Sequence, residues 1–171
     1  MNYKRHKQYR LPYFNYASTG LYFVTICSHH RKNIFGTVVN RKVILSKIGL
    51  CIFDCINNLP LKLSYVTLDE FVIMPNHLHA IIQIVNPNID RTLHEKRFQP
   101  EKASLSIIIR NFKSTVTLLT RRDLAEAKVW QPRFHDRIIR NERELHSIRK
   151  YIQDNPMQWE EDRNNPENLM M

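Results

Sequence analysis

The segment formed by residues 74–85 constrains the fold most strongly. It begins Met-Pro-Asn-His-Leu-His and continues as the isoleucine-rich apolar run Ala-Ile-Ile-Gln-Ile-Val. An apolar run that follows a Pro-Asn turn signal is typical of a buried strand. Side chains at positions i and i+2 of a strand point to the same face, so His77 and His79 should project together and Leu78 should point into the opposite layer. Two imidazoles held side by side can form half of a divalent-metal site or a paired acid–base device, although such a pair alone is a weak signal.

The length and the charge of the chain limit the classes of protein to which it can belong. With 171 residues, the chain fits a single domain, residues 1–171, with a full hydrophobic core. Its 26 Lys and Arg outnumber 16 Asp and Glu, giving a net charge of +10. This excess indicates a polyanionic partner, of which nucleic acid is the commonest; a ribosome-associated or merely basic soluble protein remains the alternative.

No apolar stretch approaches the ~20 residues of a membrane span. The first seven residues, MNYKRHK, are basic but lead into no apolar segment of the kind that secretory signals carry. We therefore expect a cytoplasmic protein. The three cysteines, Cys27, Cys51 and Cys55, have no paired-ligand spacing and lie among apolar residues, which favours reduced core thiols.

The periodicity of apolar residues predicts an α+β fold. Residues 21–27, 65–73, the segment from His77 and residues 134–139 are typical of strands. Residues 43–59, the segment after Ser104 and residues 141–155 have helical spacing, and Asn141 with Glu144 forms a capping box. Residues 86–102 are predicted to form a loop. The order β-α-β-β-α-β, with one extra C-terminal helix, is the ferredoxin-like pattern of an antiparallel sheet with helices on one face.

The last predicted helix carries two polar residues at i and i+4, Tyr151 and Asn155, which can reach the same spot. Alone, this spacing usually reflects packing and a helix C-cap. Combined with the histidine pair, it supplies two imidazoles and one amide oxygen, which are three neutral ligands for a divalent ion. Neutral ligands leave the ion its full positive charge and open positions for a phosphate.

Three separate motifs resemble one family. They are Met-Pro-Asn-His-Leu-His at 74–79, Trp-Gln-Pro-Arg-Phe-His-Asp at 130–136 followed by Ile-Arg-Asn at 139–141, and Tyr-Ile-Gln-Asp-Asn-Pro at 151–156, with Tyr-Phe-Val-Thr at 22–25 in the first strand. In this order they are similar to the single-tyrosine HUH transposases of short bacterial insertion sequences (IS200-like), especially the REP-associated tyrosine transposases. The resemblance covers residues 11–159, flanked by a flexible basic N-terminal lead and a polar C-terminal tail.

The resemblance implies a role for each matching residue. Tyr151 corresponds to the nucleophile, His77 and His79 to the paired metal ligands, and Asn155 to the third ligand of a Mg or Mn ion. The best-known insertion-sequence members have Gln at that third position, and Asn is similar to the REP-associated branch. The implied activity is cleavage and rejoining of single-stranded hairpin DNA, such as REP-like palindromic repeats, through a covalent 5′-phosphotyrosine intermediate. The resemblance also implies a bacterial protein that associates with the nucleoid when bound to DNA.

The basic residues are candidates for DNA binding, together with one histidine that is a second candidate for site chemistry: Arg10, Arg31, Lys32, Arg110, Lys113, Arg133, His135, Arg137 and Arg140. Three alternatives stay open: a catalytically inactive or domesticated DNA- or RNA-binding module on the same fold, an RNA-recognition-type sheet without catalysis, and a structural zinc site, which the poor ligand Asn disfavours. The sequence leaves open whether the protein acts as a monomer or as a homodimer.

Overall fold

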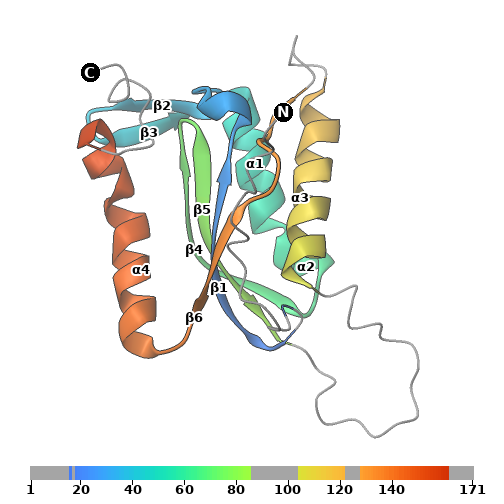
Figure 1. The fold of residues 1–171 in the computed structure, drawn as a ribbon. Helices are drawn as coiled ribbons and strands as arrows, with labels where there is room; N and C mark the ends of the chain where they lie inside the picture. Colours follow the sequence, from blue (N-terminus) through green and yellow to red (C-terminus); the bar gives the residue numbers. More distant parts are fainter. Residues whose placement is uncertain (1–15, 17, 86–103, 122–127, 162–171) are drawn as a thin grey trace, which may run out of the picture.

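The computed structural model describes residue 16 and residues 18–85, 104–121 and 128–161. Within them, an antiparallel sheet contains β1 (Gly20–Cys27), β4 (Val66–Met74), β5 (His77–Ile84) and β6 (His135–Ile139) in the order β4-β5-β1-β6 (Figure 1). Helices α1 (Lys47–Asn57) and α2 (Leu59–Lys62) precede β4, and α3 (Leu105–Thr120) lies between β5 and β6 in the chain. Strand β5 is inserted between β1 and β4, which is the split β-α-β arrangement of ferredoxin-like folds. The predicted fold class is confirmed.

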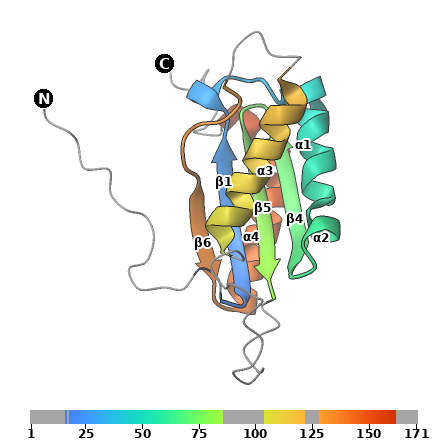
Figure 2. The same ribbon diagram turned by 90° about the vertical axis from the view of Figure 1, so that its right-hand side faces the viewer.

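The sheet is covered on both faces. Helices α1 and α3 lie on one face, and α4 (Glu142–Asp154), which continues into the 3₁₀ segment η3 (Asn155–Glu161), lies on the other (Figures 1 and 2). Alternate residues of β1 and β5 form two separate cores: Tyr22 and Leu78 belong to the α1–α3 side, whereas Phe23 and Ile81 pack with Ile148 of α4. By the same alternation, His77 and His79 face the α4 layer and Leu78 faces away from it, as the sequence predicted.

The sequence prediction of a helix from residue 43 is wrong. Residues 36–45 form a hairpin of β2 (Gly36–Val39) and β3 (Lys42–Leu45), and α1 begins only after Ser46, whose hydroxyl accepts a hydrogen bond from the Gly49 amide at 3.1 Å. Asn40 and Arg41 both have positive φ, 51° and 63°, which is the backbone of a two-residue type I′ turn. Ile44 and Ile48 stand four residues apart across the strand–helix junction, and this spacing imitated a helical period.

Strand β4 contains a bulge. Leu68 pairs with Ile82 and Phe71 pairs with Ala80, so Asp69 and Glu70 together oppose the single residue Ile81. The extra residue allows both carboxylates to point to the α4 side. Beyond the bulge, the side chains again alternate between the two faces of the sheet. As a result, Val72 lies opposite His79 on the α4 face.

Two predicted helix starts behave differently. Asn141 caps α4 through its Oδ1, which accepts the Glu144 amide at 2.9 Å, and the Glu144 carboxylate accepts the Arg140 amide at 3.0 Å. Ser104 occupies the N-cap position of α3, but its side chain makes no capping bond. Leu119, whose position fits the apolar spacing of this helix in the sequence, is 58% exposed.

Several sequence predictions lie outside the described residues: the basic lead and Arg10, the loop at 86–102 and the C-terminal tail. Cys27 and Cys55 are buried free thiols and Cys51 is half-buried, as expected for reduced cysteines. In the part of the chain that the structure describes, every helix is too short or too polar to cross a membrane.

Candidate active site

The two histidines of β5 and the tyrosine of α4 meet in the layer between the sheet and the helix. His77 and His79 are 0% and 3% exposed, and their ring centroids lie 4.4 Å apart. The Tyr151 hydroxyl lies 3.3 Å from Nε2 of His79. Phe23 of β1 stacks on the His79 ring at 5.2 Å and meets the Tyr151 ring edge-on at 6.2 Å, so it packs both side chains in place.

A neighbouring amide fixes the tautomer of His77. Nδ1 of His77 lies 2.8 Å from Oδ1 of Asn76, and the Asn76 amide nitrogen donates to the carbonyl of Arg31 at 3.1 Å. An amide oxygen can only accept, so Nδ1 carries the proton and donates it to Asn76. The lone pair of His77 is therefore on Nε2, the nitrogen that remains available to a ligand.

A hydroxyl on β1 holds His79 in the same way. Thr25 lies directly opposite His79 in the β1–β5 pairing, and its Oγ1 is 2.9 Å from Nδ1 of His79. A partner at Nδ1 fixes the plane of the ring and directs Nε2 towards Tyr151. Both histidines thus have their Nδ1 occupied by a fixed side chain, which is the outer-shell arrangement common around metal-binding imidazoles.

Among the predicted metal-ligand atoms, two buried acceptors have no hydrogen-bond partner within the described residues: Nε2 of His77 and Oδ1 of Asn155. Asn155 is 1% exposed and follows Tyr151 by one helical turn, and the Trp159 ring of the same 3₁₀ segment lies 6.1 Å from the His77 ring. Leaving such an atom unsatisfied in the interior costs about 1–3 kcal/mol. Two lone-pair donors left in this way fit a bound cation, although the described residues include no cluster of three His, Cys, Asp or Glu.

Burial, with a smaller contribution from the positive charge of Arg31, lowers the pKa of His77 from 6.5 to about 3. The imidazole is consequently neutral throughout the physiological range, as a metal ligand must be.

We expect this shift to make folding stability depend on pH. Between about pH 6.5 and pH 3 the unfolded chain binds a proton at His77 and the native chain does not, so acidification favours unfolding by up to ~1.4 kcal/mol per pH unit; above pH 6.5 the contribution vanishes. Urea unfolding of the chelator-treated wild type and His77→Gln, from pH 7.5 to 4.5, measures it. The wild type should lose stability more steeply, and equal slopes would contradict the neutral buried imidazole.

The edge strand β6 brings two predicted DNA-binding residues to the same face as the site. His135 pairs with Thr25 and Arg137 pairs with Phe23, so both side chains point to the α4 side, one strand beyond the residues that contact His79. His135 is exposed, and Nε of Arg137 lies 2.6 Å from the Glu144 carboxylate.

The other predicted DNA-binding residues are spread more widely. Arg31 is half-buried beside His77, whereas Lys32, Arg110, Arg133 and Arg140 are exposed. Lys113 is partly buried and donates to the carbonyls of Gln131 and Arg133 at 2.7 and 3.0 Å, and burial lowers its pKa. These two bonds attach the segment after residue 130 to α3.

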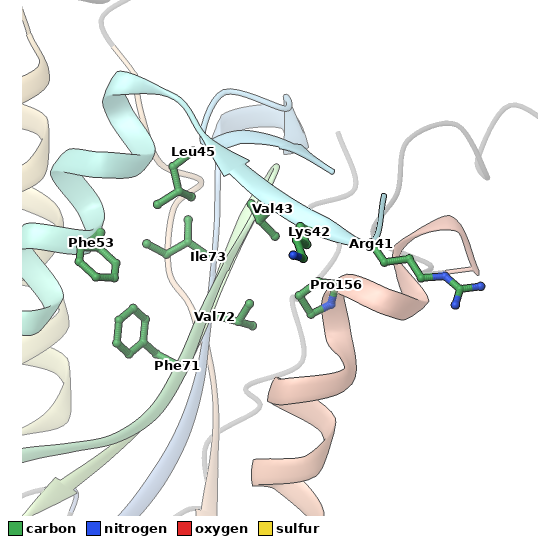
Figure 3. Close-up of a pocket in the computed structure, with 9 residues that line it drawn as sticks. All are labelled: Arg41, Lys42, Val43, Leu45, Phe53, Phe71, Val72, Ile73 and Pro156. Carbon is green, nitrogen blue, oxygen red and sulfur yellow. The ribbon is translucent and has the colours of Figure 1, made fainter. Parts of the chain in front are cut away.

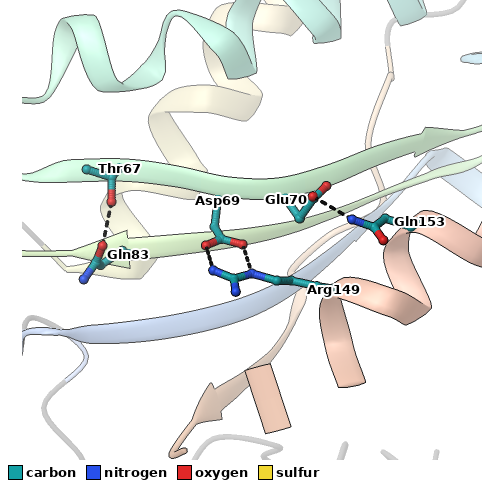
Figure 4. A network of polar contacts seen from close by, with 6 residues as sticks. All are labelled: Thr67, Asp69, Glu70, Gln83, Arg149 and Gln153. Carbon is teal, nitrogen blue, oxygen red and sulfur yellow. Dashed lines mark hydrogen bonds and ion pairs between the residues drawn. The ribbon is translucent and has the colours of Figure 1, made fainter. Parts of the chain in front are cut away.

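The bulge of β4 anchors the tyrosine helix. Arg149 makes a bidentate pair with Asp69, at 2.7 and 2.5 Å, and Gln153 donates to Glu70 at 2.9 Å (Figure 4). The two anchoring residues stand two positions before and two positions after Tyr151. The contacts therefore set where along the sheet the tyrosine hydroxyl lies.

Sequence reasoning missed Asn76, Thr25 and the Asp69–Glu70 pair. Asn76 was visible as the neighbour of His77, but only as a turn signal. Thr25 becomes a partner of His79 only once the register of β1 and β5 is known. The two adjacent carboxylates inside an otherwise apolar strand were the one available sign of a bulge.

Comparison with solved structures defines the fold class. The chain aligns with a REP-associated tyrosine transposase bound to a REP hairpin at a TM-score of 0.61, with 19% identity, over 90% of this chain and 74% of that one. The predicted likeness to this class is confirmed at the level of the fold. A second structure, a proposed transposase from Deinococcus radiodurans, covers 85% of this chain and 97% of its own at 14% identity, but its TM-score of 0.42 is too low to add to the argument.

The sequence itself has a much nearer relative. It is 38% identical over 160 residues to an uncharacterized protein of Haemophilus influenzae, covering 90% of this chain and 89% of that protein. The chain belongs to the same family as this protein. No family model matches it.

Proposed function

We propose that the protein is a transposase-like nuclease and strand transferase that cleaves and rejoins single-stranded hairpin DNA through a covalent 5′-phosphotyrosine intermediate. The observation that carries this proposal is the Tyr151 hydroxyl 3.3 Å from Nε2 of His79, beside a second imidazole whose Nε2 has no hydrogen-bond partner among the residues that the structure describes. The fold shared with a transposase that was solved bound to a REP hairpin supports the choice of substrate.

His77, His79 and Asn155 would hold a Mg or Mn ion, since they present two imidazole nitrogens and an amide oxygen. Such an ion neutralises the oxygens of a phosphodiester, which otherwise repel a nucleophile. Asn76 fixes the tautomer of His77 and Thr25 holds the ring of His79, so both imidazoles are oriented to bind it without any rearrangement of the sheet.

Tyr151 acts as the nucleophile. Its phenol oxygen forms a bond to phosphorus, and the bond from phosphorus to the 3′ oxygen breaks, leaving a free 3′-hydroxyl on one fragment and a 5′-phosphotyrosine on the other. The unperturbed phenol pKa is about 10, so its proton must pass to an acceptor during attack. Nε2 of His79 lies 3.3 Å from the hydroxyl, but it would be a ligand of the bound ion, so a solvent water would take the proton. A 3′-hydroxyl can later reverse the step and rejoin DNA.

The partial exposure of Tyr151 supports its role as the nucleophile. Tyr151 is 39% exposed, whereas the histidines beneath it are buried. The nucleophile therefore lies at the entrance, and the groups that would hold a cation lie behind it. The net charge of +10 favours phosphate contacts, and binding should weaken steeply as salt concentration rises.

We expect the wild-type protein to cleave a single-stranded oligonucleotide that carries a hairpin from the DNA flanking its gene, in the presence of Mg or Mn. A 3′-labelled strand should yield a protein-linked label on a denaturing gel, and a 5′-labelled strand should yield a shorter, protein-free fragment. A chelator should prevent both.

The same assay separates the rival functions. Attachment of the 5′-labelled fragment would contradict the 5′-phosphotyrosine. Specific hairpin binding with neither product, in any divalent metal, would instead identify an inactive DNA-binding module on this fold.

A further inference from the structure

An open groove of about 390 Å³ lies between hairpin β2–β3, helix α1 and strand β4, which is an edge strand of the sheet (Figure 3). Its two ends differ in chemistry. One end is apolar and includes Phe53, Phe71, Leu45 and Ile73. The other end is bordered by Arg41 and Lys42, which are exposed at the hairpin turn.

The basic end of the groove adjoins the candidate active site. Val72 lines the groove and pairs directly with His79 across β4 and β5. Pro156 also lines it and follows Asn155 in the chain. Residues paired across two strands have Cβ atoms about 4.5–5.5 Å apart. When single-stranded DNA is held at His79, an adjacent nucleotide can therefore reach the groove.

The apolar end offers a surface for a flat ring. Phe53 is 44% exposed, and its ring lies 5.8 Å from that of Phe71 at an interplanar angle of 50°. Unpaired bases bind proteins by stacking on aromatic side chains, while Lys and Arg contact the phosphates of the same strand. A basic entrance followed by an apolar, aromatic interior therefore matches one nucleotide of a single strand.

We propose that this groove binds the unpaired base of a nucleotide adjacent to the scissile phosphate, with Arg41 and Lys42 contacting the backbone phosphate. The inference rests on the proposed function, because that function brings a single strand to His79. A second copy of this chain is a poorer occupant, since a net charge of +10 repels its own copy.

The test uses a probe that needs no knowledge of the natural substrate. Methyl NMR spectra of the Tyr151→Phe protein, which cannot turn the probe over, are recorded with the tetranucleotide (dT)4 and with an abasic tetramer of the same charge. We expect (dT)4 to shift the methyl signals of Val43, Leu45 and Ile73, and the abasic tetramer to shift them much less. Leu61, 83% exposed on α2, provides a control signal that should stay in place.

Two groove variants separate the base from the phosphate. Phe53→Ala should weaken (dT)4 binding roughly five- to hundredfold, the range found when a base-stacking aromatic is removed, and leave the abasic tetramer unaffected. Arg41→Ala should weaken both probes and lower the slope of log K against log salt by about one. Leu61→Ala is the matched control and should change neither.

Equal shifts by the two tetramers, or DNA binding that leaves the groove methyls unmoved, would overturn the proposal. Groove shifts that follow protein concentration without DNA would assign the surface to a second copy instead. Failure of the proposed nuclease function would give a different result from failure of the groove proposal. The base-dependent groove shifts would persist, but the wild type would cleave no hairpin.

Discussion

Replacing Tyr151 by phenylalanine should abolish the covalent protein–DNA adduct and leave the affinity for the same hairpin unchanged. The substitution removes only the hydroxyl oxygen that lies 3.3 Å from His79, and the ring keeps its edge-on contact with Phe23. We expect phosphate contacts from Lys and Arg to dominate the affinity, and the change does not touch them. A denaturing gel of 3′-labelled substrate measures the adduct, and anisotropy of labelled hairpin measures binding.

A second tyrosine provides the control for this result. Tyr65→Phe removes a hydroxyl from a half-buried tyrosine that packs against the α1–α3 core, and it should retain the adduct. Persistence of the adduct in Tyr151→Phe would mean that another residue is the nucleophile.

The second large effect is expected at His77. His77→Ala removes the imidazole whose Nε2 is unpartnered in the described part of the chain. It should reduce metal-dependent cleavage by more than ~100-fold, beyond the loss seen when only an outer hydrogen-bond partner of a ligand is removed. Binding of the hairpin should be largely retained. Rates across a Mn titration, with thermal melts in chelator to verify folding, measure the change.

Asn76→Ala provides the graded comparison. It leaves both imidazoles in place but removes the acceptor that keeps the proton of His77 on Nδ1. The metal concentration at half-maximal rate should rise about 10- to 100-fold, while the rate at saturating metal recovers. If His77→Ala cleaved as fast as the wild type at every Mn concentration, His77 would not be a ligand.

Much of the site could be predicted because its key positions obey local periodicity. The i, i+2 spacing of His77 and His79 and the i, i+4 spacing of Tyr151 and Asn155 are properties of one strand and one helix, so they are visible in the sequence. The capping box at Asn141 is local in the same sense, and the structure contains it. The assigned roles of these residues stay predictions until the chemistry is measured.

What could not be predicted depends on pairing between distant segments. Thr25 reaches His79 only through the register of β1 and β5, a relation across 54 residues of chain. The hairpin at 36–45 was missed because its turn uses Asn40 and Arg41 in left-handed backbone instead of the glycine that usually marks such a turn. The anchoring of α4 by Asp69 and Arg149 likewise joins residues 80 positions apart.

The bulge in β4 limits how this strand can evolve. Val66 and Leu68 before it, and Phe71 and Ile73 after it, all face the α1–α3 core, although an uninterrupted strand would send the two pairs to opposite faces. Deletion of either Asp69 or Glu70 would put Phe71 and Ile73 under α4 and turn Val72 away from His79. The alternative is that the residues before the bulge exchange faces instead. Substitutions that keep the length of β4 preserve this arrangement. Inserting or deleting one residue would change which side chains of β4 enter each of the two cores.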